Sequence, residues 1–214
     1  MRKEQFEEGQ FYHIYNRGVD KRHVFLDDRD KTRFINTLYI LNNFLNIPHR
    51  FDVVDLKPLD LLTPIKPFVD IVAGCIMPNH FHLMLSPRSK KGVSSFLHKV
   101  GTSYSMYFNI RRERTGRLFE NVFKAKHIDR HEYANYLTQY IHLNPVGLFD
   151  RSLTAEGTLT KLGDYQWSTL PDYLGKKSRF SPIISGNFRT EILGLDAKEY
   201  EQLVRDIYLE YVQS

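Results

Sequence analysis

The chain has 214 residues, of which 42% are hydrophobic and 26% charged, the balance of a globular protein rather than a disordered one. Its single cysteine, Cys75, excludes a disulfide framework and a cysteine-based zinc cluster, and is typical of a reducing cytosol. The most apolar stretch, residues 68–77, is too short and too polar to span a bilayer. The N-terminal residues form no apolar core, so we expect no secretory signal and a cytoplasmic, nucleoid-associated protein.

The formal net charge of +5 is unevenly distributed along the chain. Residues 88–130 hold 11 basic and three acidic side chains, so the whole positive excess lies in this segment. Such a concentration predicts a surface that binds a polyanion, although a solvated basic surface has the same composition. The side chains expected to contact this polyanion are Arg111, Arg112, Arg114, Arg117, Lys124 and Lys126.

Hydrophobic periodicity and turn residues divide the first 143 residues into strands and helices. The predicted order is a strand at 11–16, a helix at 28–44, a proline-rich loop at 47–67, a hairpin of strands at 68–77 and 80–86, a helix at 93–110, a strand at 118–128 and a helix at 129–143. This order predicts an α+β fold, with one mostly antiparallel sheet and helices packed on it. We expect residues 1–150 to form the domain and residues 151–214 to form a C-terminal extension, ending in a helix, packed on that domain.

Two histidines alternate with Phe81 on the predicted strand at 80–86. Because successive side chains of a strand point to opposite faces, His80 and His82 lie on the same face. Two such imidazoles can bind one divalent metal as adjacent ligands, although each can equally be satisfied by backbone or water. With no cysteine partner a structural zinc cage is excluded, which favours Mg²⁺ or Mn²⁺ with open positions for water or phosphate oxygens.

The predicted helix at 129–143 carries three tyrosines. Tyr136, Tyr140 and Asn144 follow one another at steps of four and therefore share one face, while Tyr133 lies one turn before them. A tyrosine stripe at this spacing is also typical of a core or an interface. Periodicity alone therefore selects none of these tyrosines as a nucleophile.

Five sequence blocks follow one another over most of the chain. They are YHIYNRG at 12–18, MPNHFHL at 77–83, GRLF at 116–119 with FK at 123–124, YIHLNPV at 140–146 and YQWS at 165–168. In this order they resemble the signature blocks of the transposase IS200-like family, the single-tyrosine HUH transposases, and in particular their REP-associated branch. The resemblance implies the ferredoxin-like fold of HUH nucleases.

The resemblance also implies a reaction and its residues. His80 and His82 take the role of the two histidine ligands, Asn144 that of the third metal ligand, and Tyr140 that of the nucleophile. The implied reaction is cleavage and rejoining of single-stranded or hairpin DNA, with Mg²⁺ or Mn²⁺, through a 5′-phosphotyrosine intermediate. The family further implies a homodimer, for which the aromatic segments 11–15 and 119–123 are candidate edges, unless the acidic tail after residue 150 covers one of them.

The chain departs from the family pattern at two places. Residues 147–149 are GLF where the family commonly has an arginine and small residues, and residues 121–122 are NV where an arginine is common. Both changes affect expected DNA contacts or packing rather than the metal site or the nucleophile. Two other functions remain open: a DNA-binding protein on the same fold without strand transfer, and a metal-dependent nuclease that uses water in place of Tyr140.

Overall fold

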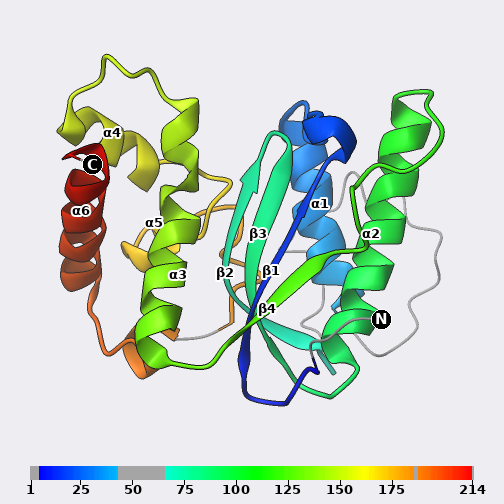
Figure 1. Ribbon diagram of the computed structural model, residues 1–214, viewed down its shortest axis with the longest axis horizontal. Helices are drawn as coiled ribbons and strands as arrows, with labels where there is room; N and C mark the ends of the chain where they lie inside the picture. The colour runs from blue at the N-terminus through cyan, green and yellow to red at the C-terminus, as the bar shows by residue number, and fades with distance from the viewer. Residues whose placement is uncertain (1–4, 43–65, 186–187, 214) are drawn as a thin grey trace.

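The computed structural model describes residues 5–42, 66–185 and 188–213. Figure 1 shows one sheet with helices on both of its faces. The strands are β1 (Phe11–Arg17), β2 (Val69–Met77), β3 (His80–Pro87) and β4 (Lys124–Ile128). The longer helices are α1 (Asp28–Leu41), α2 (Gly92–Arg111), α3 (His131–Leu143), α4 (Ala155–Gly163) and α6 (Ala197–Gln213); shorter ones are η1 (Val19–Lys21), η3 (Asn144–Leu148), α5 (Leu170–Tyr173) and η4 (Phe188–Ile192).

The four strands pair in the order β2-β3-β1-β4, and each neighbouring pair is antiparallel. This arrangement confirms the predicted α+β fold. In the register of β1 with β3, Tyr15 lies opposite His82 and Arg17 opposite His80. In the register of β1 with β4, His13 lies opposite Lys126. The register therefore brings three segments that are distant in sequence to one face of the sheet.

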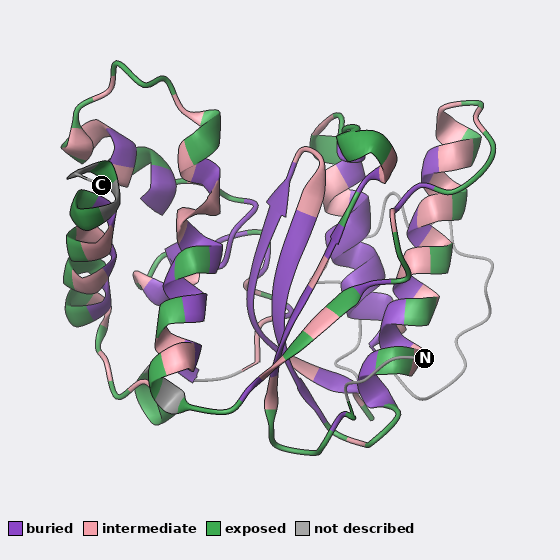
Figure 2. Cartoon of the chain, in the orientation of Figure 1, coloured by how far each residue is buried: buried purple, intermediate pink, exposed green. Residues whose placement is uncertain are grey.

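Alternation along the strands divides the apolar residues between two cores. One face of the sheet buries Tyr12, Ile14 and Phe81 against α1 and α2. The other face packs on α3 and on the C-terminal segment, and its core includes Leu137 and Tyr200. Figure 2 shows the buried residues concentrated on the strands and on the helix sides that face them. The second layer, between the sheet and α3, holds the candidate site.

Segment 118–128 forms a much shorter strand than predicted. Only Lys124–Ile128 pairs as β4, and Phe119 forms an isolated bridge with Gly18. The reason is that a side chain, and not a neighbouring strand, binds the backbone of this segment. The Asn16 Nδ2 group donates hydrogen bonds to the backbone oxygens of Asn121 and Val122, at 2.8 and 2.9 Å. The predicted loop at 47–67 lies almost entirely outside the described residues.

The sheet edges differ from those expected for a dimer. Strand β1 is paired on both sides, so the prediction that residues 11–15 form an edge is wrong. The β2 edge is bridged by the C-terminal segment, through Ile71 to Ile184 and Cys75 to Ser168. The remaining edge, β4, is five residues long and carries two lysines, features that disfavour edge-to-edge pairing. Among the described helices, none has an apolar stretch long enough to cross a membrane.

Candidate active site

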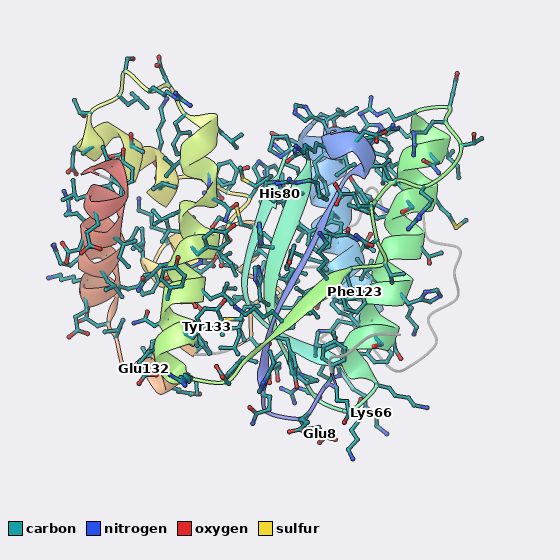
Figure 3. All side chains as sticks on the ribbon, in the orientation of Figure 1. Glu8, Lys66, His80, Phe123, Glu132 and Tyr133 are labelled. Atoms are coloured by element: carbon teal, nitrogen blue, oxygen red, sulfur yellow. The ribbon has the colours of Figure 1, made fainter. Side chains whose placement is uncertain are left out.

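The candidate site lies on the sheet face that α3 covers, which we call the site face. Its side chains come from alternate positions of three strands, as the pleat requires. Figure 3 labels His80 on this face, between the sheet and α3. The site face consists of His13, Tyr15 and Arg17 from β1, His80 and His82 from β3, and Lys124 and Lys126 from β4.

Asn144 reaches the site face from the end of α3. Pro145 follows it and has no backbone N–H for the helical hydrogen-bond ladder, so α3 ends there and the short helix η3 begins. Asn144 Nδ2 donates a hydrogen bond to the backbone oxygen of Tyr140 at 2.8 Å. This bond turns the Asn144 amide so that Oδ1 lies 3.2 Å from Nε2 of His80. Two of the predicted metal ligands, 64 residues apart, are thus brought together.

His82 is held by a histidine from the neighbouring strand. Nε2 of His13 and Nδ1 of His82 share a hydrogen bond of 2.8 Å, and the two rings are nearly parallel with their centroids 5.0 Å apart. Both side chains are buried. The other histidine of β3 is also fixed by a side chain: Nδ1 of His80 forms a hydrogen bond of 2.6 Å with Oδ1 of Asn79.

Burial keeps these imidazoles neutral. The pKa of His13 is lowered to about 4 and that of His82 to about 2, chiefly by burial, and the Lys126 charge contributes to the shift of His13. The pKa of His80 is also lowered by burial, although its hydrogen bond to Asn144 acts in the opposite direction. A neutral imidazole has a free lone pair, which is the form that binds a metal ion.

The donor set fits a divalent cation. In both His80 and His82 the Nδ1 atom is engaged by an outer partner, the usual arrangement of metal-binding histidines. A metal bound by Nε2 of His80 and Oδ1 of Asn144 would take the place of the hydrogen bond between these two atoms. Two ligands at right angles around an ion lie about 3 Å apart, close to the distance between His80 Nε2 and Asn144 Oδ1. In the described part of the chain no three His, Cys, Asp or Glu side chains gather into a metal site. A third protein ligand here must therefore be of another type, such as the Asn144 amide.

Tyr140 lies on α3 directly above the histidines. Its ring meets those of His82 and His13 edge-on, with centroids 5.5 and 6.3 Å away. Leu137 and Ile141 are buried on the other side of the helix and fix its orientation. Tyr140 nevertheless remains 45% exposed. The hydroxyl-bearing ring is thus accessible to a substrate bound on the site face.

The six predicted DNA contacts do not form one surface. Lys124 and Lys126 lie on the site face and are exposed. Arg111 and Arg112 instead lie at the end of α2, where both guanidinium groups pair with Asp27 and Asp30 of the α1 start.

The carboxylates engage these two arginines through several hydrogen bonds. The Arg111 guanidinium donates a hydrogen bond of 2.8 Å to the Asp27 carboxylate, and this bond is the main cause of the lowered pKa of Asp27. Asp30 is completely buried and also accepts a hydrogen bond from Tyr107. Arg114 and Arg117 follow in the next loop and donate hydrogen bonds to the backbone oxygens of Arg117 and Glu120, respectively. We therefore leave Arg111 and Arg112 out of the proposed DNA surface.

Sequence reasoning missed His13, Tyr15 and Arg17 as site residues. His13 and Tyr15 alternate along the predicted strand at 11–16 in the same way as His80 and His82 do on theirs, so their shared face was already readable from the sequence. Arg17 joins them because β1 extends one residue beyond the predicted strand. What the sequence did not show is that β1 lies next to β3. That pairing places Arg17 opposite His80 and Tyr15 opposite His82.

Comparisons with known proteins identify a related family and a related fold. Residues 66–144 match the family model described as Transposase IS200 like, which confirms the resemblance read from the sequence blocks. A solved structure of the REP-associated tyrosine transposase bound to a REP hairpin matches with a TM-score of 0.53 and 12% identity, over 87% of this chain and 92% of that one. This match shows a shared fold. Among curated proteins, none matches the sequence.

Proposed function

We propose that this IS200-like chain cuts and rejoins single-stranded DNA beside a hairpin, with Tyr140 as the nucleophile and a divalent metal held by His80, His82 and Asn144. One observation carries the proposal. The Tyr140 ring, the two histidines and the Asn144 amide converge on one spot of the site face, although they come from different elements.

The proposed reaction exchanges one phosphate ester for another. The Tyr140 hydroxyl oxygen bonds to phosphorus and loses its proton, while the bond from phosphorus to the 3′ oxygen breaks and that oxygen takes up a proton. The products are a 5′-phosphotyrosine and a free 3′-hydroxyl. Because the covalent link keeps the ester, a 3′-hydroxyl can reverse the step without a nucleotide cofactor.

The protein groups around Tyr140 serve this exchange in distinct ways. Mg²⁺ or Mn²⁺, when bound, polarises the scissile phosphate and stabilises the charge that develops on it. Asn144 links the ligand set to the helix of the nucleophile, because its side chain bonds both His80 and the Tyr140 backbone. Arg17, exposed and opposite His80, is placed to bind a phosphate oxygen.

The substrate assignment has separate support. The structural match is to a transposase bound to a REP hairpin, and the family model is one of transposases. In this chain Lys124, Lys126 and Arg17 lie on the same sheet face as the histidines beneath Tyr140, and their charges suit a phosphate backbone. We propose single-stranded DNA attached to a hairpin as the substrate.

The decisive experiment incubates the protein with labelled hairpin DNA carrying single-stranded extensions, plus Mn²⁺ or Mg²⁺, and looks for a protein–DNA adduct on a denaturing gel. We expect an adduct that Tyr140→Phe abolishes while DNA binding persists. Cleavage without an adduct, unchanged in Tyr140→Phe, would instead identify a hydrolytic nuclease that uses water. Binding without cleavage in the wild-type protein would identify a DNA-binding protein on the same fold.

A further inference from the structure

A second aromatic feature continues from Tyr140 along α3. Tyr136 lies one turn before Tyr140 and Tyr133 almost two turns before it, or about 6 and 10 Å along the helix axis. Tyr136 is 56% exposed, more than Tyr140 itself. The proposed reaction uses neither side chain. An aromatic surface left open beside a nucleophile suggests a ligand that covers it.

The two rings form an ordered platform. Their centroids are 6.2 Å apart and their planes are inclined by 26°, so both present their faces in similar directions. Tyr133 is in turn fixed by β4: the Lys126 ammonium lies 4.5 Å from its ring centre and donates a hydrogen bond of 2.9 Å to its hydroxyl. In Figure 3, Tyr133 lies on the side of α3 toward β4.

Positive charge lies on the neighbouring strand, β4. Lys124 and Lys126 alternate onto the same face of β4, and Lys124 Nζ lies 5.8 Å from the ring centre of Tyr15 on the site face. Aromatic faces beside a row of cations are the arrangement that binds single strands, because bases stack on the rings while the cations meet phosphates. A duplex offers no unstacked base faces to such a platform.

The row has a defined end. Tyr133 and Tyr136 border a surface hollow with Lys126 and Arg130, and Asp129 and Glu132 also line this hollow. Carboxylates repel a phosphate backbone, so a strand that follows the row from Tyr140 leaves the protein near Tyr133. At about 3.4 Å per stacked base, the distance from Tyr140 to Tyr133 spans roughly three nucleotides.

We infer that Tyr133, Tyr136 and Lys126 form a stacking subsite for the single-stranded nucleotides that adjoin the scissile phosphate. The inference rests on the proposed function only in that Tyr140 marks the position of that phosphate. Recognition at this subsite is through base faces and backbone charge, so it tolerates different base sequences.

The test uses two DNA probes and a Tyr140→Phe background, which prevents covalent trapping. One probe is a hairpin with single-stranded thymidine extensions on both strands, and the other is the same hairpin with a blunt end. We expect Tyr136→Ala to weaken binding of the extended hairpin by about tenfold and to leave the blunt hairpin unaffected. Tyr136→Phe should retain the wild-type affinity, because it keeps the ring.

A matched control removes another exposed apolar side chain. Met106 on α2 is 59% exposed and lies outside the site face, so Met106→Ala should bind both probes normally. Equal loss for both probes in Tyr136→Ala, or a loss as large in Tyr136→Phe, would overturn the inference. Circular dichroism verifies that each variant is folded.

A fluorescent base locates the contact. With 2-aminopurine placed at successive extension positions, we expect quenching at one to three positions next to the cleavage site, lost in Tyr136→Ala. No protein-dependent quenching at any position contradicts stacking. The result is separable from the proposed function: an adduct in the wild-type protein with no Tyr136 effect rejects the subsite alone, whereas stacking without any adduct rejects strand transfer alone.

Discussion

His13 and His82 face each other across β1 and β3, with His13 Nε2 2.8 Å from His82 Nδ1. The contact engages one nitrogen of His82 and leaves the other for the proposed metal. It also places a second imidazole beneath the Tyr140 ring. A residue on a strand 69 positions away in sequence thus orients a predicted metal ligand.

Replacing His13 should weaken metal use rather than DNA binding. We expect His13→Phe to raise the Mn²⁺ concentration needed for half-maximal adduct formation by about 10- to 100-fold, because the outer partner of His82 is lost. His13→Gln, whose amide can form the same hydrogen bond, should restore most of the metal response. An equal shift in both variants, or no shift in either, would contradict a positioning role.

The three proposed ligands should be needed for cleavage and dispensable for binding. His80→Ala, His82→Ala and Asn144→Ala are each expected to abolish the adduct and to leave affinity for hairpin DNA largely unchanged, because affinity comes from the cations of the site face. A chelator should have the same effect on the wild-type protein. Parallel loss of binding and cleavage would argue against the assignment.

Arg17 should contribute to the chemical step. It lies opposite His80 in the sheet register and is exposed. We expect Arg17→Gln to slow adduct formation at saturating DNA and metal, since a charge beside the scissile phosphate is removed. Arg22→Gln, on the neighbouring turn and paired with Asp20, is the matched control and should cleave normally.

Salt dependence distinguishes the two groups of predicted DNA contacts. The slope of log affinity against log salt should become less steep by about 0.7 in Lys124→Gln, the change expected for one phosphate contact on a single strand. Arg111→Met should leave the slope unchanged, because its charge is already paired with Asp27 and Asp30. Equal slopes in the wild-type protein and Lys124→Gln would mean that this lysine faces solvent and contacts no phosphate.

Arg111 should instead matter for stability. Removing its guanidinium takes one hydrogen bond from the fully buried Asp30 and two from Asp27, so we expect Arg111→Met to lower the free energy of unfolding by about 2 kcal/mol. Arg112 and Tyr107 still hold Asp30 in that variant. Urea denaturation of both proteins measures the difference, and an unchanged midpoint would contradict the structural role.

The same ion pairs predict an acid dependence. The folded-state pKa of Asp27 is lowered, chiefly by its hydrogen bond from Arg111. The stabilisation from Asp27 is therefore complete above about pH 4, the pKa of an unfolded aspartate, and is lost as the pH falls through the lower folded value. The stability gap between wild-type and Arg111→Met proteins should shrink in acid. A stability difference that grows as the pH falls would contradict a lowered pKa of Asp27 in the folded protein.

The features that depend on local backbone geometry could be predicted from the amino-acid sequence. Alternation along a strand put His80 and His82 on one face, and helical spacing put Tyr140 one turn from Asn144. Both relations follow from repeats of two and 3.6 residues. The α+β fold followed from the order of these periodic segments, and the ordered blocks pointed to the family.

Only the tertiary structure decided which distant residues meet. The β1–β3 register made His13 the partner of His82, and the packing of α1 against α2 paired Arg111 and Arg112 with acids more than 80 residues away. Segment 118–123 left the ladder because the Asn16 side chain binds its carbonyls. Such pairings depend on strand order, register and burial, which are properties of the whole chain, so no local pattern contains them.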